Sequence, residues 1–181
     1  FVFDKNFNFE TYVDYALNVP MYFIKRDNHY LDMTDLSFKD YLNGKSNKFN
    51  KRFDPTNQDW EDHISTLFPQ VRLKQYLEVR SMDTCSWETI CSPAAFWTGI
   101  LYDENALNES YELMEDWTNE ERLHLHLNVP ITGLNTKFRD KKILDISKKL
   151  LEISEQGLKN RNNLSPNNKY DESFYLENIK K

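Results

Sequence analysis

Glycine is scarce in this chain of 181 residues, which contains four glycines with no two of them close together. A loop that wraps phosphate groups needs several glycines within a few residues. The chain also lacks a Gly-x-Ser-x-Gly turn and a Ser-His-Asp order, the patterns of two kinds of serine hydrolase. Any nucleotide site in this chain must therefore rely on carboxylates and arginines carried by strands.

Cysteine is rarer still, with Cys85 and Cys91 as its two occurrences. Two cysteines do not build the disulfide framework of a small secreted protein, so we expect free thiols and a cytoplasmic location. No apolar run approaches the roughly 20 residues that cross a bilayer, which argues against a membrane partner. The sequence begins without a signal-peptide pattern or an initiator methionine, so we expect the middle of a longer protein.

Positive charge is neither abundant nor concentrated. The chain has 23 Lys and Arg against 29 Asp and Glu, for a net charge of −6. Binding to nucleic acid depends on clustered Lys and Arg that neutralise phosphates, so we do not expect a nucleic-acid partner. Aromatic residues make up 14% of the chain, which is enough for a folded core.

The hydrophobic periodicity predicts a few strands among many helices. Strands are expected at residues 21–25, 29–31 and 71–79, with an Asp27-Asn28 turn joining the first two. Helices are expected at residues 9–17, after Ser37, after Thr56 or Asn57, at 87–102, at 105–117, after Thr118 and after Asp140. This order predicts an α+β fold in a single partial domain over residues 1–181, with polar loops at 45–55 and 159–169.

Three histidines could suggest a metal site, but their spacing argues against one. Thr118 and Glu121 form a capping-box pattern, so His124 and His126 should lie on a helix. Two residues apart on a helix, their side chains point about 200° away from each other. His63 is expected on an exposed helix face, in contact with solvent.

The segment around Glu78 and Arg80 carries the clearest chemical signal. On a strand these two side chains share one face, about 7 Å apart, while Leu77 and Val79 face the core. A carboxylate beside a guanidinium can hold a divalent cation and a phosphate together. The alternative is a surface ion pair that contributes less than about 1 kcal/mol.

Two aromatic residues stand where a pocket could form. Tyr22 lies at the start of a predicted strand and Phe68 at the end of a predicted helix. Each residue, taken alone, is more often part of a core than of a binding site.

Longer motifs follow one another along the chain. They are the residues 9–23, 59–63, 67–74, 76–80, 95–103, 116–118 with 121–122, and 133–134 with 138–140. In this order they resemble the plant and proteobacterial type of glutamate–cysteine ligase, over residues 1 to about 160. The resemblance implies part of a glutamine-synthetase-like catalytic core, with antiparallel strands flanked by helices.

The resemblance also implies a reaction and its groups. Such enzymes use ATP and Mg²⁺ to phosphorylate the γ-carboxylate of glutamate, and the amine of cysteine then displaces phosphate. By position, Glu78 resembles the strand glutamate that ligates Mg²⁺, and Arg80 resembles the arginine that contacts the transferred phosphoryl group. Tyr22 and Phe68 resemble residues of the cysteine pocket.

The sequence departs from the plant members in the loop at residues 81–89, where those members have glycines and arginines. This difference leaves open a related ligase that uses another amine, or a non-catalytic module that keeps the fold. Retention of Glu78 and Arg80 argues against the module.

The family's other metal carboxylates, its adenine contacts and much of its glutamate site lie upstream of Phe1. We therefore expect the C-terminal portion of the catalytic domain, inactive without the N-terminal portion of the same protein. Exposed strand edges and core surface in such a portion favour self-association.

Redox control of the plant kind should be absent. The plant members carry regulatory cysteines at the positions of Met33 and near Lys48 in this chain. We predict that dithiothreitol leaves the activity of the whole enzyme unchanged in a steady-state assay; a several-fold response would contradict this.

Overall fold

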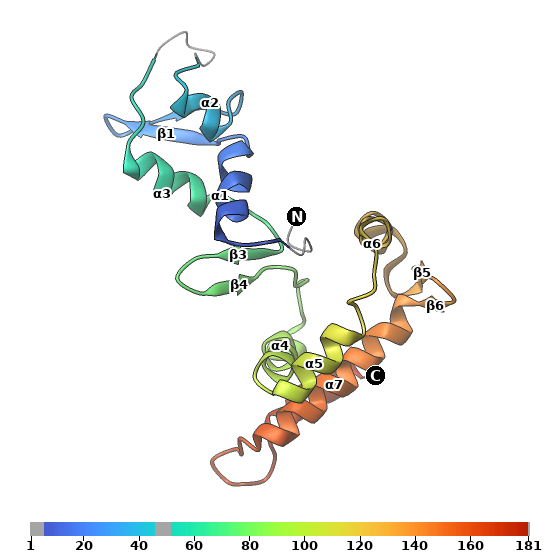
Figure 1. Cartoon of the computed structure of the whole chain (residues 1–181). Helices are drawn as coiled ribbons and strands as arrows, with labels where there is room; N and C mark the ends of the chain where they lie inside the picture. The colour runs from blue at the N-terminus through green and yellow to red at the C-terminus, as the bar shows by residue number, and fades with distance from the viewer. Residues whose placement is uncertain (1–5, 46–51, 181) are drawn as a thin grey trace. The chain divides into compact units, whose positions relative to one another are not determined.

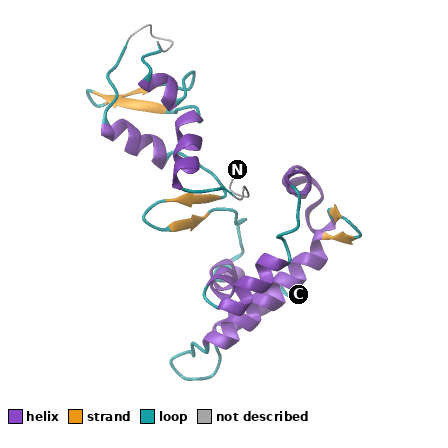
Figure 2. Cartoon of the chain, viewed as in Figure 1, coloured by secondary structure: helices purple, strands orange, loops and turns teal. Residues whose placement is uncertain are grey.

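The computed structural model describes residues 6–45 and 52–180 (Figure 1). Lys48 and most of the predicted polar loop at 45–55 lie outside the described residues. The chain divides into two compact units, residues 1–81 and 82–181. Each unit combines helices with small antiparallel sheets (Figure 2), so the predicted α+β class is confirmed. The sheets among the described residues have two strands each, and the larger catalytic sheet and the single partial domain stay predictions.

The first unit contains five of the expected elements in the expected order. Its elements are α1 (Phe9–Asn18), β1 (Phe23–Arg26), β2 (His29–Asp32), α2 (Phe38–Leu42), α3 (Asn57–Ser65), β3 (Val71–Leu73) and β4 (Leu77–Val79). Asp27 and Asn28 have φ angles of 48° and 61°, as a two-residue hairpin turn requires. The side chains of Ser37 and Thr56 cap α2 and α3, as predicted.

The core of this unit lies between the hairpin β1–β2 and helices α2 and α3. Its buried side chains are Met21, Ile24, Met33, Leu36, Phe38 and Tyr41. Met33 is 1% exposed. It therefore serves here as a packing residue of the core.

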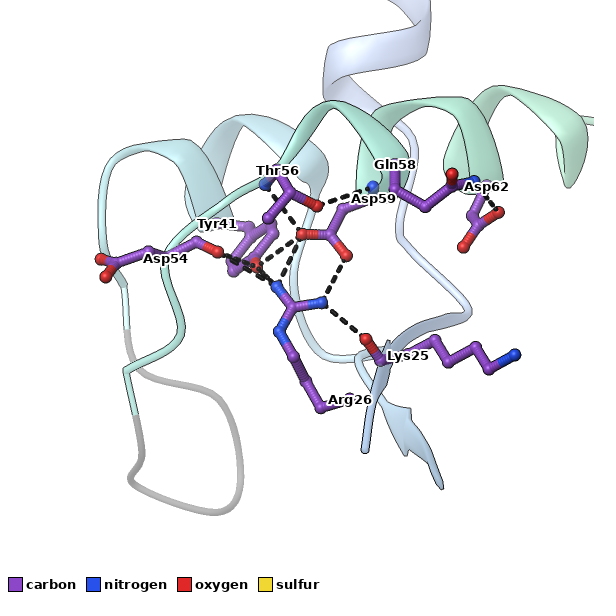
Figure 3. Close-up of polar contacts among 8 residues, drawn as sticks. All are labelled: Lys25, Arg26, Tyr41, Asp54, Thr56, Gln58, Asp59 and Asp62. Atoms are coloured by element: carbon purple, nitrogen blue, oxygen red, sulfur yellow. Dashed lines mark hydrogen bonds and ion pairs between the residues drawn. The ribbon is translucent and has the colours of Figure 1, made fainter. Parts of the chain in front are cut away.

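An ion pair joins the hairpin to the start of α3 (Figure 3). Arg26 donates from Nη1 and Nη2 to the two carboxylate oxygens of Asp59, each at 2.7 Å. The hydroxyl of Tyr41 and the backbone N–H of Thr56 donate to the same carboxylate at 3.1 and 2.9 Å. Burial raises the pKa of Asp59, but the hydrogen bonds from Arg26 and Thr56 outweigh it and the pKa is lowered. Burial also raises the pKa of Tyr41 to about 12.

The segment 71–79 is a hairpin, and the prediction of one continuous strand is wrong. Residues 71–73 pair antiparallel with residues 77–79, as strands β3 and β4 (Figure 1). In this register Arg72 lies opposite Glu78. The backbone N–H of Lys74 donates to the carbonyl of Tyr76 at 2.9 Å and closes the turn. Glu78 and Arg80 do share a face, as predicted, but Leu77 is 70% exposed and does not face the core of this unit.

His63 is buried, and the prediction of a solvated side chain is wrong. It is 2% exposed and stacks on Phe38, with ring centroids 5.0 Å apart. Its Nε2 lies 2.7 Å from the carbonyl oxygen of Ala16. Because a carbonyl can only accept, Nε2 carries the proton, and the buried Nδ1 has no hydrogen-bond partner among the described residues. Protonation would therefore bury an unpaired donor, and this desolvation lowers the pKa of His63.

The second unit is built around the long helix α7. Its elements are α4 (Ser92–Leu101), α5 (Glu104–Glu112), α6 (Asn119–Thr132), β5 (Lys137–Phe138), β6 (Lys141–Lys142), α7 (Ile143–Arg161) and the 3₁₀ segments Trp87–Thr89, Gly133–Asn135 and Glu172–Ile179. Helix α4 crosses α7 where Gly99 meets Gly157, and a Cβ on Gly157 would overlap the carbonyl of Gly99. The hydroxyl of Ser154 donates to the carbonyl of Phe96 at 2.7 Å beside this crossing.

Several predicted boundaries in this unit need correction. The helix expected at 87–102 is interrupted, because a short 3₁₀ segment precedes α4. The helix expected at 105–117 ends at Glu112. Lys142, not Asp140, is the N-cap residue of α7, because Asp140 lies in the turn between β5 and β6. Helix α7 continues to Arg161, so the loop expected at 159–169 begins after that residue.

The ion pair between Arg26 and Asp59 should stabilise the first unit strongly. Removing one partner of a buried pair leaves an uncompensated charge, so we predict that Asp59→Asn lowers the free energy of unfolding by about 3 kcal/mol in thermal or urea denaturation. The matched control is Asp62→Asn on the same helix, whose carboxylate accepts from Gln58 at the surface. Equal stability of the two variants would contradict the assignment.

His63 should make stability depend on pH. Its pKa in the folded protein lies below the ordinary value of 6.5, so its contribution is present above that pH and is lost as the pH falls. We predict that His63→Gln, which stays neutral, loses less melting temperature than the wild type between about pH 7 and pH 5. His29→Gln on the exposed strand β2 is the control and should follow the wild type. Parallel curves for the wild type and His63→Gln would refute the prediction.

Candidate functional site

The four residues singled out from the sequence form one continuous series of contacts in the first unit. The rings of Tyr22 and Phe68 meet edge to face, with centroids 6.2 Å apart. The guanidinium of Arg80 lies over Phe68, 5.1 Å from the ring centroid. Nη1 of Arg80 donates to Oε1 of Glu78 at 3.1 Å. Residues from the start of β1, the end of α3 and strand β4 thus meet on one surface.

The two aromatic residues are exposed, which decides between their alternative interpretations. Tyr22 is 52% exposed and Phe68 is 60% exposed. Neither residue is therefore a core aromatic of this unit, and both present apolar surface beside a cation. A cation over an aromatic face is attracted by the ring electrons, so Phe68 also helps to hold Arg80 in place.

A further arginine, Arg72, belongs to this cluster and was not predicted. Its Nε donates to Oε2 of Glu78 at 2.7 Å, across the β3–β4 hairpin. If 71–79 were one strand, six residues would separate Arg72 from Glu78 by about 20 Å. The turn at residues 74–76 contains no Gly, Asn or Asp, so the usual signal for a hairpin was missing.

The cluster carries a net positive charge. Hydrogen bonds from Arg72, and then from Arg80, hold the pKa of Glu78 below its usual range despite some desolvation. Two guanidinium groups against one carboxylate leave one unit of positive charge on this surface. Such a surface suits an anionic group such as a phosphoryl or a carboxylate.

Glu78 retains some capacity to bind a cation. Each of its oxygens accepts one hydrogen bond in the structure, whereas a carboxylate offers about four lone-pair positions. The described part of the chain holds no group of three or more His, Cys, Asp or Glu side chains that could bind a metal ion. A cation held by Glu78 would need its other ligands from outside this cluster.

The remaining candidates from the sequence do not join this cluster. His124 and His126 lie on helix α6, as predicted, and Nε2 of His124 is 3.0 Å from the carbonyl of Lys137. Cys85 and Cys91 are free thiols, as predicted. Among residues 6–45 and 52–180, no helix is long and apolar enough to cross a membrane.

Comparison with known proteins gives a consistent result along the whole chain. The model of glutamate-cysteine ligase family 2 matches residues 1–181. Glutamate–cysteine ligase A, chloroplastic, of Oryza sativa subsp. indica is 49% identical over 161 residues, which are 89% of this chain and 32% of the rice protein. The chloroplastic glutamate–cysteine ligase of Nicotiana tabacum is 44% identical over 179 residues, 99% of this chain and 33% of the tobacco protein.

The chain thus spans about a third of the length of the curated relatives that it matches. The expectation of a cytoplasmic location is wrong, because the relatives from rice, tomato and Arabidopsis thaliana are all named chloroplastic enzymes. The family model covers all of the motifs that suggested the resemblance. The chain therefore belongs to glutamate-cysteine ligase family 2.

Proposed function

We propose that this chain forms part of the active site of a glutamate–cysteine ligase, the enzyme that joins the γ-carboxylate of glutamate to the amine of cysteine. The observation that carries the proposal is the contact series Tyr22, Phe68, Arg80 and Glu78 on one surface. Membership of the family and 44–49% identity to enzymes of that name support it. By the same relationship, we propose a chloroplast as the location.

The reaction has two steps. An oxygen of the glutamate γ-carboxylate attacks the γ-phosphorus of ATP, which forms an acyl phosphate and releases ADP. The amine nitrogen of cysteine then attacks the acyl carbon, the bond to the phosphate oxygen breaks, and the amine loses a proton. The first step transfers a phosphoryl group and the second releases it as inorganic phosphate, so a group of high negative charge must be stabilised in both.

Arg80 is suited to that phosphoryl group. Its guanidinium is oriented by Glu78 on one side and by the ring of Phe68 below it. A cation fixed in advance stabilises the charge that develops in the transition state more than a mobile one does. We assign Arg80 to the transferred phosphoryl group for this reason.

Glu78 would hold Mg²⁺ as one ligand among several. When bound, Mg²⁺ supplies positive charge to the phosphate oxygens of ATP. The free lone pairs of Glu78 and its place beside Arg80 suit this role. Tyr22 and Phe68 would receive the side chain of cysteine, since a sulfur atom packs favourably against aromatic rings.

The whole activity is proposed for the longer polypeptide, because the chain spans about a third of its relatives. The remaining metal ligands and the nucleotide contacts would come from parts of that polypeptide outside this chain. The direct test is ADP release by that polypeptide with ATP, Mg²⁺ and glutamate, with and without cysteine. Release that requires cysteine and yields γ-glutamylcysteine supports the proposal, whereas release with another amine alone would show a related ligase.

Glu78 provides the sharpest mutational test. We predict that Glu78→Gln in the full-length enzyme lowers kcat by at least about 100-fold, because the metal and Arg80 both lose a charged partner. The melting temperature should also fall, since the buried Arg72 loses its charged partner, so kcat is measured well below the melting temperature of the variant. The control is Glu61→Gln on the exposed face of α3, which should keep wild-type activity. Wild-type kcat in Glu78→Gln would remove Glu78 from the site.

A further inference from the structure

Arg72 is the most deeply buried charged group near the candidate site. Its side chain is 9% exposed, compared with 29% for Arg80 and 30% for Glu78. A substrate at this surface would meet Arg80 and Phe68, which are accessible to solvent, whereas Arg72 is buried. Any effect of Arg72 on the reaction must therefore pass through other residues.

Arg72 makes contacts to two separate elements. On one side, Nε donates to Glu78 on strand β4 at 2.7 Å. On the other side, Nη1 donates to the backbone carbonyls of Ser65 and Leu67 at 2.7 and 3.3 Å. These carbonyls lie at and just beyond the end of helix α3, where helical carbonyls lack intrahelical partners and the helix dipole is negative. The buried charge is thus compensated from both sides.

These contacts fix the groups that face the ligand. The bond from Arg72 holds Oε2 of Glu78, which leaves Oε1 directed to Arg80. The bond to Leu67 holds the residue next to Phe68, and both guanidinium groups lie over that ring, at 5.9 and 5.1 Å. Arg72 therefore restrains Arg80 through its carboxylate partner and through its aromatic support.

We infer that Arg72 is a positioning residue that sets the orientation of Arg80 through Glu78 and Phe68. The kinetic effect of this inference rests on the proposed function. The restraint of Arg80 by Arg72 rests on the contacts alone. Arg72 exchanges no proton and forms no bond with a substrate. Lysine should not replace it, because a single ammonium group lacks the planar fork that reaches Glu78 and the two carbonyls together.

The kinetic test uses the full-length enzyme. Arg72→Lys keeps the charge and should lower kcat by about 10- to 100-fold, as loss of a supporting contact commonly does, with the KM for glutamate changed by less than about 3-fold. The matched control is Lys74→Met, which removes a cation from the same hairpin at an exposed position and should keep wild-type kcat. A fall in kcat for Lys74→Met equal to that for Arg72→Lys would overturn the inference.

A double-mutant cycle separates positioning from general destabilisation. If Arg72 acts through Arg80, then Arg72→Lys in an Arg80→Lys background should lower kcat by less than about 3-fold further. If the double variant lowered kcat by the product of the two separate factors, the inference would be overturned, because the two arginines would then act independently.

A readout without catalysis distinguishes failure of this inference from failure of the proposed function. Nitrogen-15 relaxation of the arginine side chains, measured on the full-length polypeptide, reports the mobility of Arg80 directly. Arg80 should be ordered in the wild type and mobile in Arg72→Lys. Glu78→Asp, which leaves Arg72 intact but shortens the carboxylate, should also release Arg80 and serves if Arg72→Lys does not fold. An Arg80 that stays equally ordered in the folded variants would overturn the inference, whatever the enzyme's activity.

Discussion

The antiparallel pairing of β3 with β4 determines where the charged groups of the candidate site lie. It places Arg72 opposite Glu78, and the next residue on the same face of the chain is Arg80. A carboxylate between two guanidinium groups is held from both sides, while the set as a whole stays positive. The same side chains on one extended strand would lie along a line and could not converge.

Helix α3 connects this hairpin with the rest of the first unit. In its first turn, Asp59 forms an ion pair with Arg26 of the hairpin β1–β2. Just beyond its last turn, the carbonyl of Leu67 accepts a hydrogen bond from Arg72. An acidic residue at the start and a cation at the end both suit the dipole of a helix. Because Phe68 follows the end of this helix directly, its place beside Tyr22 depends on both anchors. The scaffold and the site are therefore stabilised by the same helix.

Local patterns in the sequence predicted those features that depend on neighbours along the chain. The caps at Ser37, Thr56 and Thr118 and the Asp27-Asn28 turn are examples, since each needs only a side chain and the adjacent backbone. The β3–β4 hairpin was missed because its turn lacks the residues that mark such turns. The burial of His63 was missed because Phe38 and Ala16, which enclose it, come from distant parts of the sequence.

Only part of the candidate site could be predicted, because contacts between residues distant in the sequence leave no local pattern. Tyr22, Phe68, Glu78 and Arg80 could be chosen by residue type and by resemblance, but their mutual contacts depend on how α3 and two hairpins pack. Arg72 lies within one of the motifs that carry the resemblance, residues 67–74, but its role follows only from the atoms that it joins. Their roles in the reaction remain proposals that rest on this geometry and on the family.

The central claim is that Arg80 and Glu78 form the phosphoryl-transfer surface of a ligase. The most direct measurement is an experimental structure of the full-length polypeptide with Mg²⁺, glutamate and a non-hydrolysable analogue of ATP. The account predicts the guanidinium of Arg80 within hydrogen-bond distance of the γ-phosphate and a carboxylate oxygen of Glu78 on the metal. A nucleotide bound away from this hairpin, with Glu78 and Arg80 facing solvent, would contradict it.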